Sequence, residues 1–190
     1  MLVLASSSPR RRQLLEMLGI PHRVDPSDVP EVPEPGEPAE RFAVRLAREK
    51  ALQVAARHPG TPVLGADTVV VLGPRLLGKP GSAADAMRML HELSGREHRV
   101  VTAVALALDR EVRDGCDVTR VWFRPLTAEM IEAYVATGEP LDKAGAYGVQ
   151  GYGAVLVERI EGDFFGVMGL PVRLLIELLE AAGLPYRFTR

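Results

Sequence analysis

The pattern of apolar and polar positions predicts strands and helices that follow one another along the whole chain. Short apolar or valine-rich runs, typical of buried strands, occupy residues 1–4, 62–72, 99–109, 118–126 and 153–162, with room for a short strand at 22–24. Apolar residues at helical spacing predict helices over 9–19, 38–58, 82–95, 127–138 and 171–183. The mixture predicts an α/β or mixed α+β fold whose sheet contains parallel and antiparallel pairs.

The segments between these elements predict how the chain is connected. A loop rich in proline and acidic residues is expected over 21–36, further loops over 78–82 and 162–169, and a polar link over 110–117 that joins an antiparallel pair. Four glycines within 142–153 predict a loop that lies close to something bulky. Residues 184–190 either add an edge strand or fray. We expect a single domain over 1–190, with two lobes that share a central sheet, helices on both sides and a cleft between the lobes.

Composition limits the classes of protein that fit. A net charge of −2 over 190 residues gives no general attraction to nucleic acid or to a membrane surface. A single cysteine, Cys116, excludes an internal disulfide and a cysteine-rich zinc site. No apolar run reaches the roughly 18 residues of a membrane span, and the start of the chain lacks a signal-peptide cleavage site. We therefore expect a cytoplasmic protein.

The first nineteen residues predict an anion site. Residues 6–8 form a serine loop, with Ser8 as the N-cap of a helix that Pro9 opens and Gly19 ends. Residues 10–12 are all arginine, in a first turn where each cation costs about 0.3–1 kcal/mol against the helix dipole. Free N–H groups, hydroxyls and guanidiniums together favour phosphate, and the alternative is a solvated basic patch.

Asp67 is the strongest single candidate for chemistry. It lies in a run otherwise fit for the core, so its carboxylate must be paired, bind a metal or line a cleft. The alternative is an aspartate that hydrogen bonds to a turn.

The other candidates are less specific. Lys50 alone is best interpreted as a surface lysine of a helix, whereas Lys79 lies in a loop suited to an anion. Glu31 and Glu34 are either solvated or metal ligands. Together the set indicates phosphate-ester chemistry with Mg²⁺ or Mn²⁺.

Six motifs, found in order along the chain, resemble the Maf family of nucleoside triphosphate pyrophosphatases: ASSSPRR at 5–11, RLAREKA at 45–51, GADT at 65–68, GKP at 78–80, LSG at 93–95 and PLDKAGAYGVQG at 140–151. The resemblance implies hydrolysis of a nucleoside triphosphate to the monophosphate and pyrophosphate with a divalent metal. It also implies a mixed fold related to the inosine triphosphate pyrophosphatases and a homodimer.

The resemblance also implies roles for individual residues. Asp67 matches the proton acceptor, Lys50 and Lys79 match lysines that contact phosphate, and Glu31 matches an acidic residue near the metal, where Asp67 would be a second ligand. The phosphate-binding segment corresponds to Ser6, Ser8, Arg10 and Arg11. Because successive helical residues point about 100° apart, we expect Arg10 and Arg11 to face the ligand and Arg12 to lie on the surface.

The residues at three positions resemble those of the family branch that acts on dTTP and UTP; they are Arg10, Thr68 and Gln150. A glutamine amide offers one acceptor and one donor, which suits N3–H and a carbonyl of uracil or thymine. The branch that acts on 7-methyl-GTP would have Trp, Gln and Glu there. We therefore expect a dTTP/UTP pyrophosphatase that removes certain nucleotides, including modified pyrimidines. The alternatives are a nucleotide-binding regulator of cell division or septum formation, and a pyrophosphatase with another base preference.

Overall fold

The computed structural model describes residues 1–188, which form two compact units. The first unit contains Met1–Asp67, Thr102–Asp117 and the chain from Gly169 onward, and the second contains Thr68–Val101 and Val118–Met168. Strands hydrogen bond in the order β2-β1-β3-β5-β6-β7, and β4 pairs with β3. Parallel and antiparallel pairs both occur, so the predicted mixed α/β class is confirmed.

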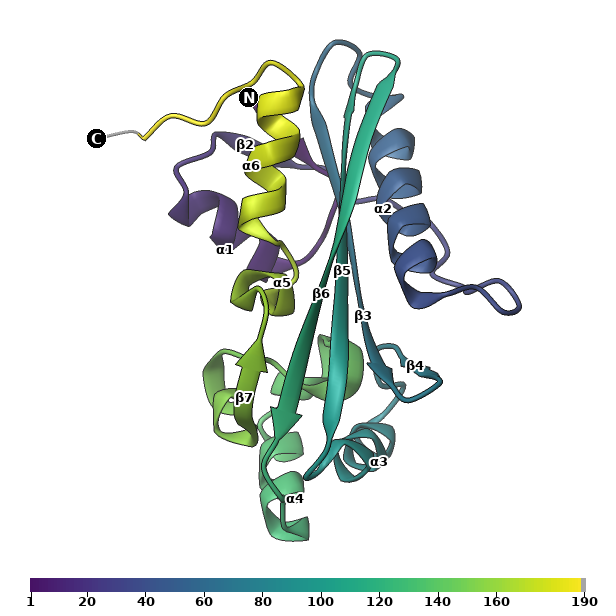
Figure 1. Ribbon diagram of the computed structural model, residues 1–190, viewed down its shortest axis with the longest axis vertical. Coiled ribbons are helices and arrows are strands. Elements are labelled where there is room, and N and C mark those ends of the chain that lie inside the picture. Colours follow the sequence, from purple (N-terminus) through teal and green to yellow (C-terminus); the bar gives the residue numbers. More distant parts are fainter. Residues whose placement is uncertain (189–190) are drawn as a thin grey trace. The chain divides into compact units, whose positions relative to one another are not determined.

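The first unit is built around parallel strands. Strand β1 (Leu2–Leu4) pairs in parallel with β2 (His22–Val24) and with β3 (Val63–Leu72). Its helices are α1 (Pro9–Met17), α2 (Ala39–Ala55) and α6 (Val172–Ala181). Figure 1 shows α2 and α6 on opposite sides of the ends of β5 (Glu97–Leu108) and β6 (Glu111–Phe123) that belong to this unit.

The second unit combines antiparallel pairs with short helices. Strand β4 (Arg75–Leu77) pairs with β3, and β7 (Val157–Glu161) pairs with β6. Its α-helices are α3 (Ala83–Leu93), α4 (Ala128–Ala136) and α5 (Phe164–Met168), and three short 3₁₀ helices are η1 (Glu139–Asp142), η2 (Ala144–Ala146) and η3 (Gly151–Leu156). Ser82 and Thr127 cap α3 and α4 through their hydroxyls.

The polar link predicted over 110–117 is wrong. Only Asp109 and Arg110 connect β5 to β6, with Asp109 in the left-handed region at φ +55°, and residues 111–117 extend β6. A Cβ on Gly115 would lie 2.6 Å from Leu174 Cδ1, so this glycine lets α6 pack closely on the strand. Packing from a distant helix therefore overrides the local polar pattern.

Three smaller predictions differ from the structure. The predicted strand over 153–162 is only β7, because its first part is η3. The loop over 162–169 contains α5, whose start is fixed by a hydrogen bond from Gly166 N–H to Asp163 Oδ1 (3.0 Å). Strand β4 has only three residues and was not predicted. Residues 184–188 form no strand, and Thr189 and Arg190 lie outside the described residues. None of the helices in 1–188 is long and apolar enough to cross a membrane.

A buried histidine lies in the core of the second unit. The rings of His98, Phe123 and Tyr147 meet edge to face, with centroids 4.7–5.3 Å apart, and His98 Nε2 hydrogen bonds to the Tyr147 hydroxyl at 2.7 Å. Burial lowers the pKa of His98 from 6.5 to about 4. The imidazole therefore stays neutral in the folded protein at pH values where the unfolded chain binds a proton.

We expect acid to destabilise the protein through His98. Because its pKa is lower when folded, its contribution to stability is complete above about pH 6.5 and is lost as the pH falls toward about 4, by roughly 3 kcal/mol. Urea denaturation at pH 7.5 and pH 4.5 measures this loss, which should shrink in His98→Phe and persist in His91→Gln, a change at an exposed site. An equal loss in wild type and His98→Phe would contradict the assignment.

Candidate active site

Asp67 and Lys50 form a buried ion pair in the first unit. Lys50 on α2 and Asp67 on β3 are 6% and 4% exposed, and Lys50 Nζ donates to Asp67 Oδ1 at 2.6 Å. Taken alone, Lys50 was best interpreted as a surface lysine, and that interpretation is wrong. The partner that makes its burial possible lies seventeen residues away on a strand, so the helical pattern around Lys50 carries no sign of it.

Gly65 sets how closely α2 approaches β3. A Cβ on this glycine would lie 2.2 Å from the carbonyl oxygen of Ala47 and 2.7 Å from the backbone nitrogen of Ala51, both on α2. Only glycine therefore permits this spacing, and the same spacing brings Lys50 within hydrogen-bond distance of Asp67.

Glu31 joins the pair from the loop before α2. Lys50 Nζ also donates to Glu31 Oε1 at 2.6 Å, although the Glu31 side chain is 46% exposed. Arg45 on α2 holds this loop, because its guanidinium donates to both oxygens of Glu37 (2.8 and 2.7 Å) and to the Val32 carbonyl (3.1 Å). Arg45 was not among the predicted site residues, and its place in the RLAREKA motif was the one available signal.

The charges around Asp67 act in opposite directions. Burial raises the pKa of Asp67, Lys50 and Arg11 lower it in part, and the Glu31 charge raises it, so the net shift is upward. Asp67 is thus a stronger base than an ordinary aspartate when it is ionised. Burial lowers the pKa of Arg11, but a guanidinium remains charged at neutral pH.

Arg11 ties the serine loop to a distant part of the first unit. Its Nε donates to the Gly169 carbonyl (2.8 Å) and its Nη1 to Ser6 Oγ (3.0 Å), which also accepts the Ser8 N–H (3.2 Å). Ser8 is the N-cap as predicted, without a hydrogen bond from its side chain to the helix. Arg12 is exposed, as predicted, and it pairs with Glu16. Arg11 therefore shapes the loop, and Arg10 is only partly buried.

The remaining predicted residues belong to the second unit. Thr68 directly follows Asp67 on β3, Lys79 is exposed in the loop before α3, and Gln150 is half-buried just before η3. The first unit thus contains the group Ser6, Arg11, Glu31, Lys50 and Asp67. The second unit contains Thr68, Lys79 and Gln150. Glu34 is exposed and lies 4.0 Å from Arg45, which fits its interpretation as a solvated residue.

Two carboxylates, those of Glu31 and Asp67, lie next to each other around Lys50. Over residues 1–188 no group of three or more His, Cys, Asp or Glu side chains is arranged to hold a metal ion. Two carboxylates fit a hard cation such as Mg²⁺, which commonly uses one or two of them and completes its shell with substrate phosphate and water.

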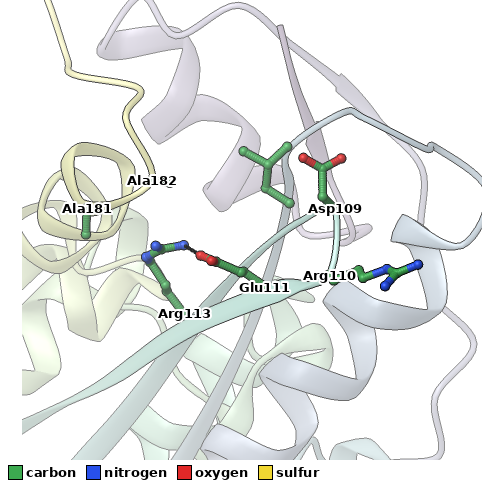
Figure 2. Close-up of a pocket in the computed structure, with 7 residues that line it drawn as sticks. Asp109, Arg110, Glu111, Arg113, Ala181 and Ala182 are labelled. Atoms are coloured by element: carbon green, nitrogen blue, oxygen red, sulfur yellow. Dashed lines mark ion pairs between the residues drawn. The ribbon is translucent and has the colours of Figure 1, made fainter.

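A pocket elsewhere in the first unit contains none of the predicted site residues. It has a volume of about 550 Å³ and lies at the β5–β6 turn, beside the end of α6 (Figure 2). Its charged lining comes from Asp109, Arg110, Glu111 and Arg113, and Glu111 and Arg113 pair with each other. We therefore assign no chemistry to this pocket.

The fold and the residues around Asp67 define the class of protein: a mixed α/β protein with a buried Lys50–Asp67 ion pair next to Arg11 and the serine loop. The chain belongs to the Maf family, since the family model described as Maf-like protein matches residues 1–182. The predicted resemblance is confirmed.

Curated relatives support the same assignment. The dTTP/UTP pyrophosphatase of Myxococcus xanthus is 54% identical, over 97% of this chain and 94% of the relative. That of Geobacter sulfurreducens is 52% identical, over 96% of each chain. Among solved structures, the Ham1 protein of Staphylococcus aureus matches 95% of this chain and 96% of its own, with a TM-score of 0.48 and 15% identity. The assignment rests on the sequence relatives.

We expect Gly65→Ala to destabilise the first unit and to disturb the site. The added methyl must push α2 away from β3, which costs about 1–3 kcal/mol or more because the obstructing atoms are backbone. Urea denaturation measures this cost, with Gly81→Ala as the matched control, since a Cβ there meets nothing within 4 Å. Equal stability of the two variants would show that Gly65 does not limit the helix–strand distance.

Proposed function

We propose that this chain is a nucleoside triphosphate pyrophosphatase that hydrolyses dTTP and UTP to the monophosphate and pyrophosphate. Two curated relatives at more than 50% identity carry the name dTTP/UTP pyrophosphatase, which supports the substrate class. The observation that carries the chemistry is the buried Lys50–Asp67 contact, because it supplies a base in the form that hydrolysis requires.

In the proposed reaction, water attacks the α-phosphorus while the ionised Asp67 carboxylate accepts a proton from that water. The bond from the α-phosphorus to the bridging oxygen breaks, and pyrophosphate leaves with the electron pair. Lys50 keeps Asp67 ionised, and the cations Arg10, Arg11 and Lys79 offset the charge that develops on the phosphate. Ser6 and Ser8 supply the loop that receives the phosphate chain.

We propose Glu31 and Asp67 as the protein ligands of Mg²⁺ or Mn²⁺. When bound, the cation would neutralise phosphate charge and orient the triphosphate. Both side chains are already gathered around Lys50, which supports their convergence on one small site.

We propose that Gln150, together with Arg10 and Thr68, determines which base the enzyme accepts. The Gln150 amide matches N3–H and a carbonyl of uracil or thymine. These two bases differ by one methyl, which a pocket discriminates by only about 1–3 kcal/mol, so both are accepted. We also propose a cytoplasmic homodimer without a nucleic-acid or membrane partner, in keeping with the net charge of −2.

A substrate panel tests the function. Purified protein is incubated with dTTP, UTP, CTP or GTP and Mg²⁺, and released pyrophosphate is measured with and without EDTA. We expect fastest release from dTTP and UTP, loss with EDTA and recovery with added Mg²⁺ or Mn²⁺. Tight nucleotide binding without pyrophosphate release would instead favour the regulator, and fastest release from GTP would mean another base preference.

Asp67→Asn should abolish most turnover while the protein stays folded. An amide cannot accept the proton, so we expect kcat to fall at least a hundredfold, as for other general bases. The control is Asp28→Asn, the same change at an exposed aspartate. Pyrophosphate release and circular dichroism separate loss of chemistry from loss of fold, and near-normal kcat in Asp67→Asn would eliminate it as the base.

Gln150→Glu should selectively weaken the binding of dTTP and UTP. A carboxylate has no N–H to donate and would repel the carbonyl oxygens of the base, so we expect KM for these substrates to rise about tenfold or more. Gln53→Glu, at an exposed glutamine, is the matched control. An unchanged preference across the panel would mean that Gln150 does not recognise the base.

A further inference from the structure

The segment Gly148–Gly153, here called the Gln150 loop, is wrapped around one carboxylate of the second unit. Glu139 Oε2 accepts the N–H of Tyr152 and Glu139 Oε1 accepts the N–H of Gly153, both at 2.9 Å. Glu139 Oε1 also accepts the hydroxyl of Tyr134 at 2.9 Å, and the Tyr134 oxygen accepts the N–H of Gly148 at 3.1 Å. Gln150 therefore lies between backbone groups that are fixed on both sides.

The glycines of the loop make this close wrapping possible. A Cβ on Gly151, which has φ +74°, would lie 2.5 Å from Glu139 Oε2. A Cβ on Gly153 would lie 2.2 Å from the Gly148 carbonyl oxygen and 2.6 Å from the Tyr134 hydroxyl. For Gly151 and Gly153, the bulky neighbours expected beside this glycine-rich stretch are thus the side chains of Glu139 and Tyr134.

The carboxylate is suited to its contacts. Burial raises the pKa of Glu139. Its hydrogen bonds and the charge of Lys143 have the opposite and larger effect, so the net shift of the pKa is downward; the hydrogen bonds come from the N–H groups of Gly153 and Tyr152 and from the Tyr134 hydroxyl. Glu139 is therefore ionised at neutral pH and serves only as an acceptor, which three donors require. Lys143, the third lysine of the chain, donates to the Glu139 carbonyl oxygen and so closes the turn that begins at Glu139.

We propose that Glu139, with Tyr134, is a positioning residue for base recognition. It holds the Gln150 loop in one conformation, so that the loop is already ordered when the Gln150 amide binds the base and no conformational entropy is lost at that step. This inference rests on the proposed function, because it assumes that Gln150 contacts the base. It adds residues that make no contact with substrate themselves and act through the backbone of the loop.

The alternative is that Glu139 only stabilises the fold. If Glu139 only stabilised the fold, its loss would leave part of the protein inactive, which lowers the apparent kcat and leaves KM unchanged. Loss of positioning would instead raise KM and leave kcat at saturation nearly unchanged, because the loop contributes to binding and not to the attack on phosphorus.

The test is a double-mutant cycle between Glu139→Gln and Gln150→Ala, with UTP as substrate. The amide of Glu139→Gln has one acceptor oxygen and turns an N–H toward a backbone N–H, so one fixed contact is lost. We expect KM to rise about tenfold, kcat to stay within threefold, and no further rise in KM when Gln150 is already alanine. Glu132→Gln, at an exposed glutamate of α4, is the matched control and should match wild type.

Hydrogen–deuterium exchange without nucleotide provides a readout that does not depend on the substrate. We expect Glu139→Gln to speed exchange at least tenfold in peptides covering 148–153, and Glu132→Gln to leave it unchanged. If Glu139→Gln does not fold, Tyr134→Phe removes both the acceptor of the Gly148 N–H and the hydroxyl donor to Glu139, and should raise KM about threefold.

The outcomes are separable. Unchanged KM and unchanged exchange in Glu139→Gln, or an equal rise in KM in the Gln150→Ala background, would overturn the inference. Wild-type protein that releases no pyrophosphate from UTP would overturn the proposed function instead, whatever the exchange shows.

Discussion

Burying the Asp67 carboxylate is unfavourable unless a cation compensates, and in the first unit that cation is Lys50. The contact depends on Gly65, because only glycine lets α2 approach β3 closely enough for the two side chains to meet. It also determines where Glu31 lies, since the same ammonium binds both carboxylates. One ammonium thus holds the proposed base and a second carboxylate together, and Arg11 adds positive charge nearby while fixing the serine loop.

The second unit holds its partly buried carboxylate in a different way. Glu139 is a partly buried anion whose partners are backbone N–H groups and a tyrosine hydroxyl. Backbone donors fix a loop more firmly than a flexible side chain can, because they move only with the main chain. Both units therefore use a carboxylate to order structure, but Asp67 keeps an elevated pKa and Glu139 a lowered one. The first suits a proton acceptor and the second suits a permanent hydrogen-bond acceptor.

The sequence predicted best what local patterns determine. The first strand and helix, the caps Ser82 and Thr127, the last helix and the burial of Asp67 all have their signals within a few residues. Features that depend on distant partners were not predicted. Lys50 looked like a surface residue because its partners lie on a strand and in a loop, and residues 111–117 looked like a polar link because the helix that packs on them, α6, comes much later in the chain. Arg45 and Glu139 act on backbone segments, and no spacing rule predicts such contacts.

Lys50 keeps a buried, strongly basic Asp67 ionised. An NMR titration of the Asp67 carboxyl carbon in wild type and in Lys50→Met measures this effect directly. We expect a pKa above the ordinary aspartate value of about 3.9 in wild type and a further rise in Lys50→Met, because desolvation then acts without its main opposing charge. An ordinary pKa that is the same in both proteins would contradict it.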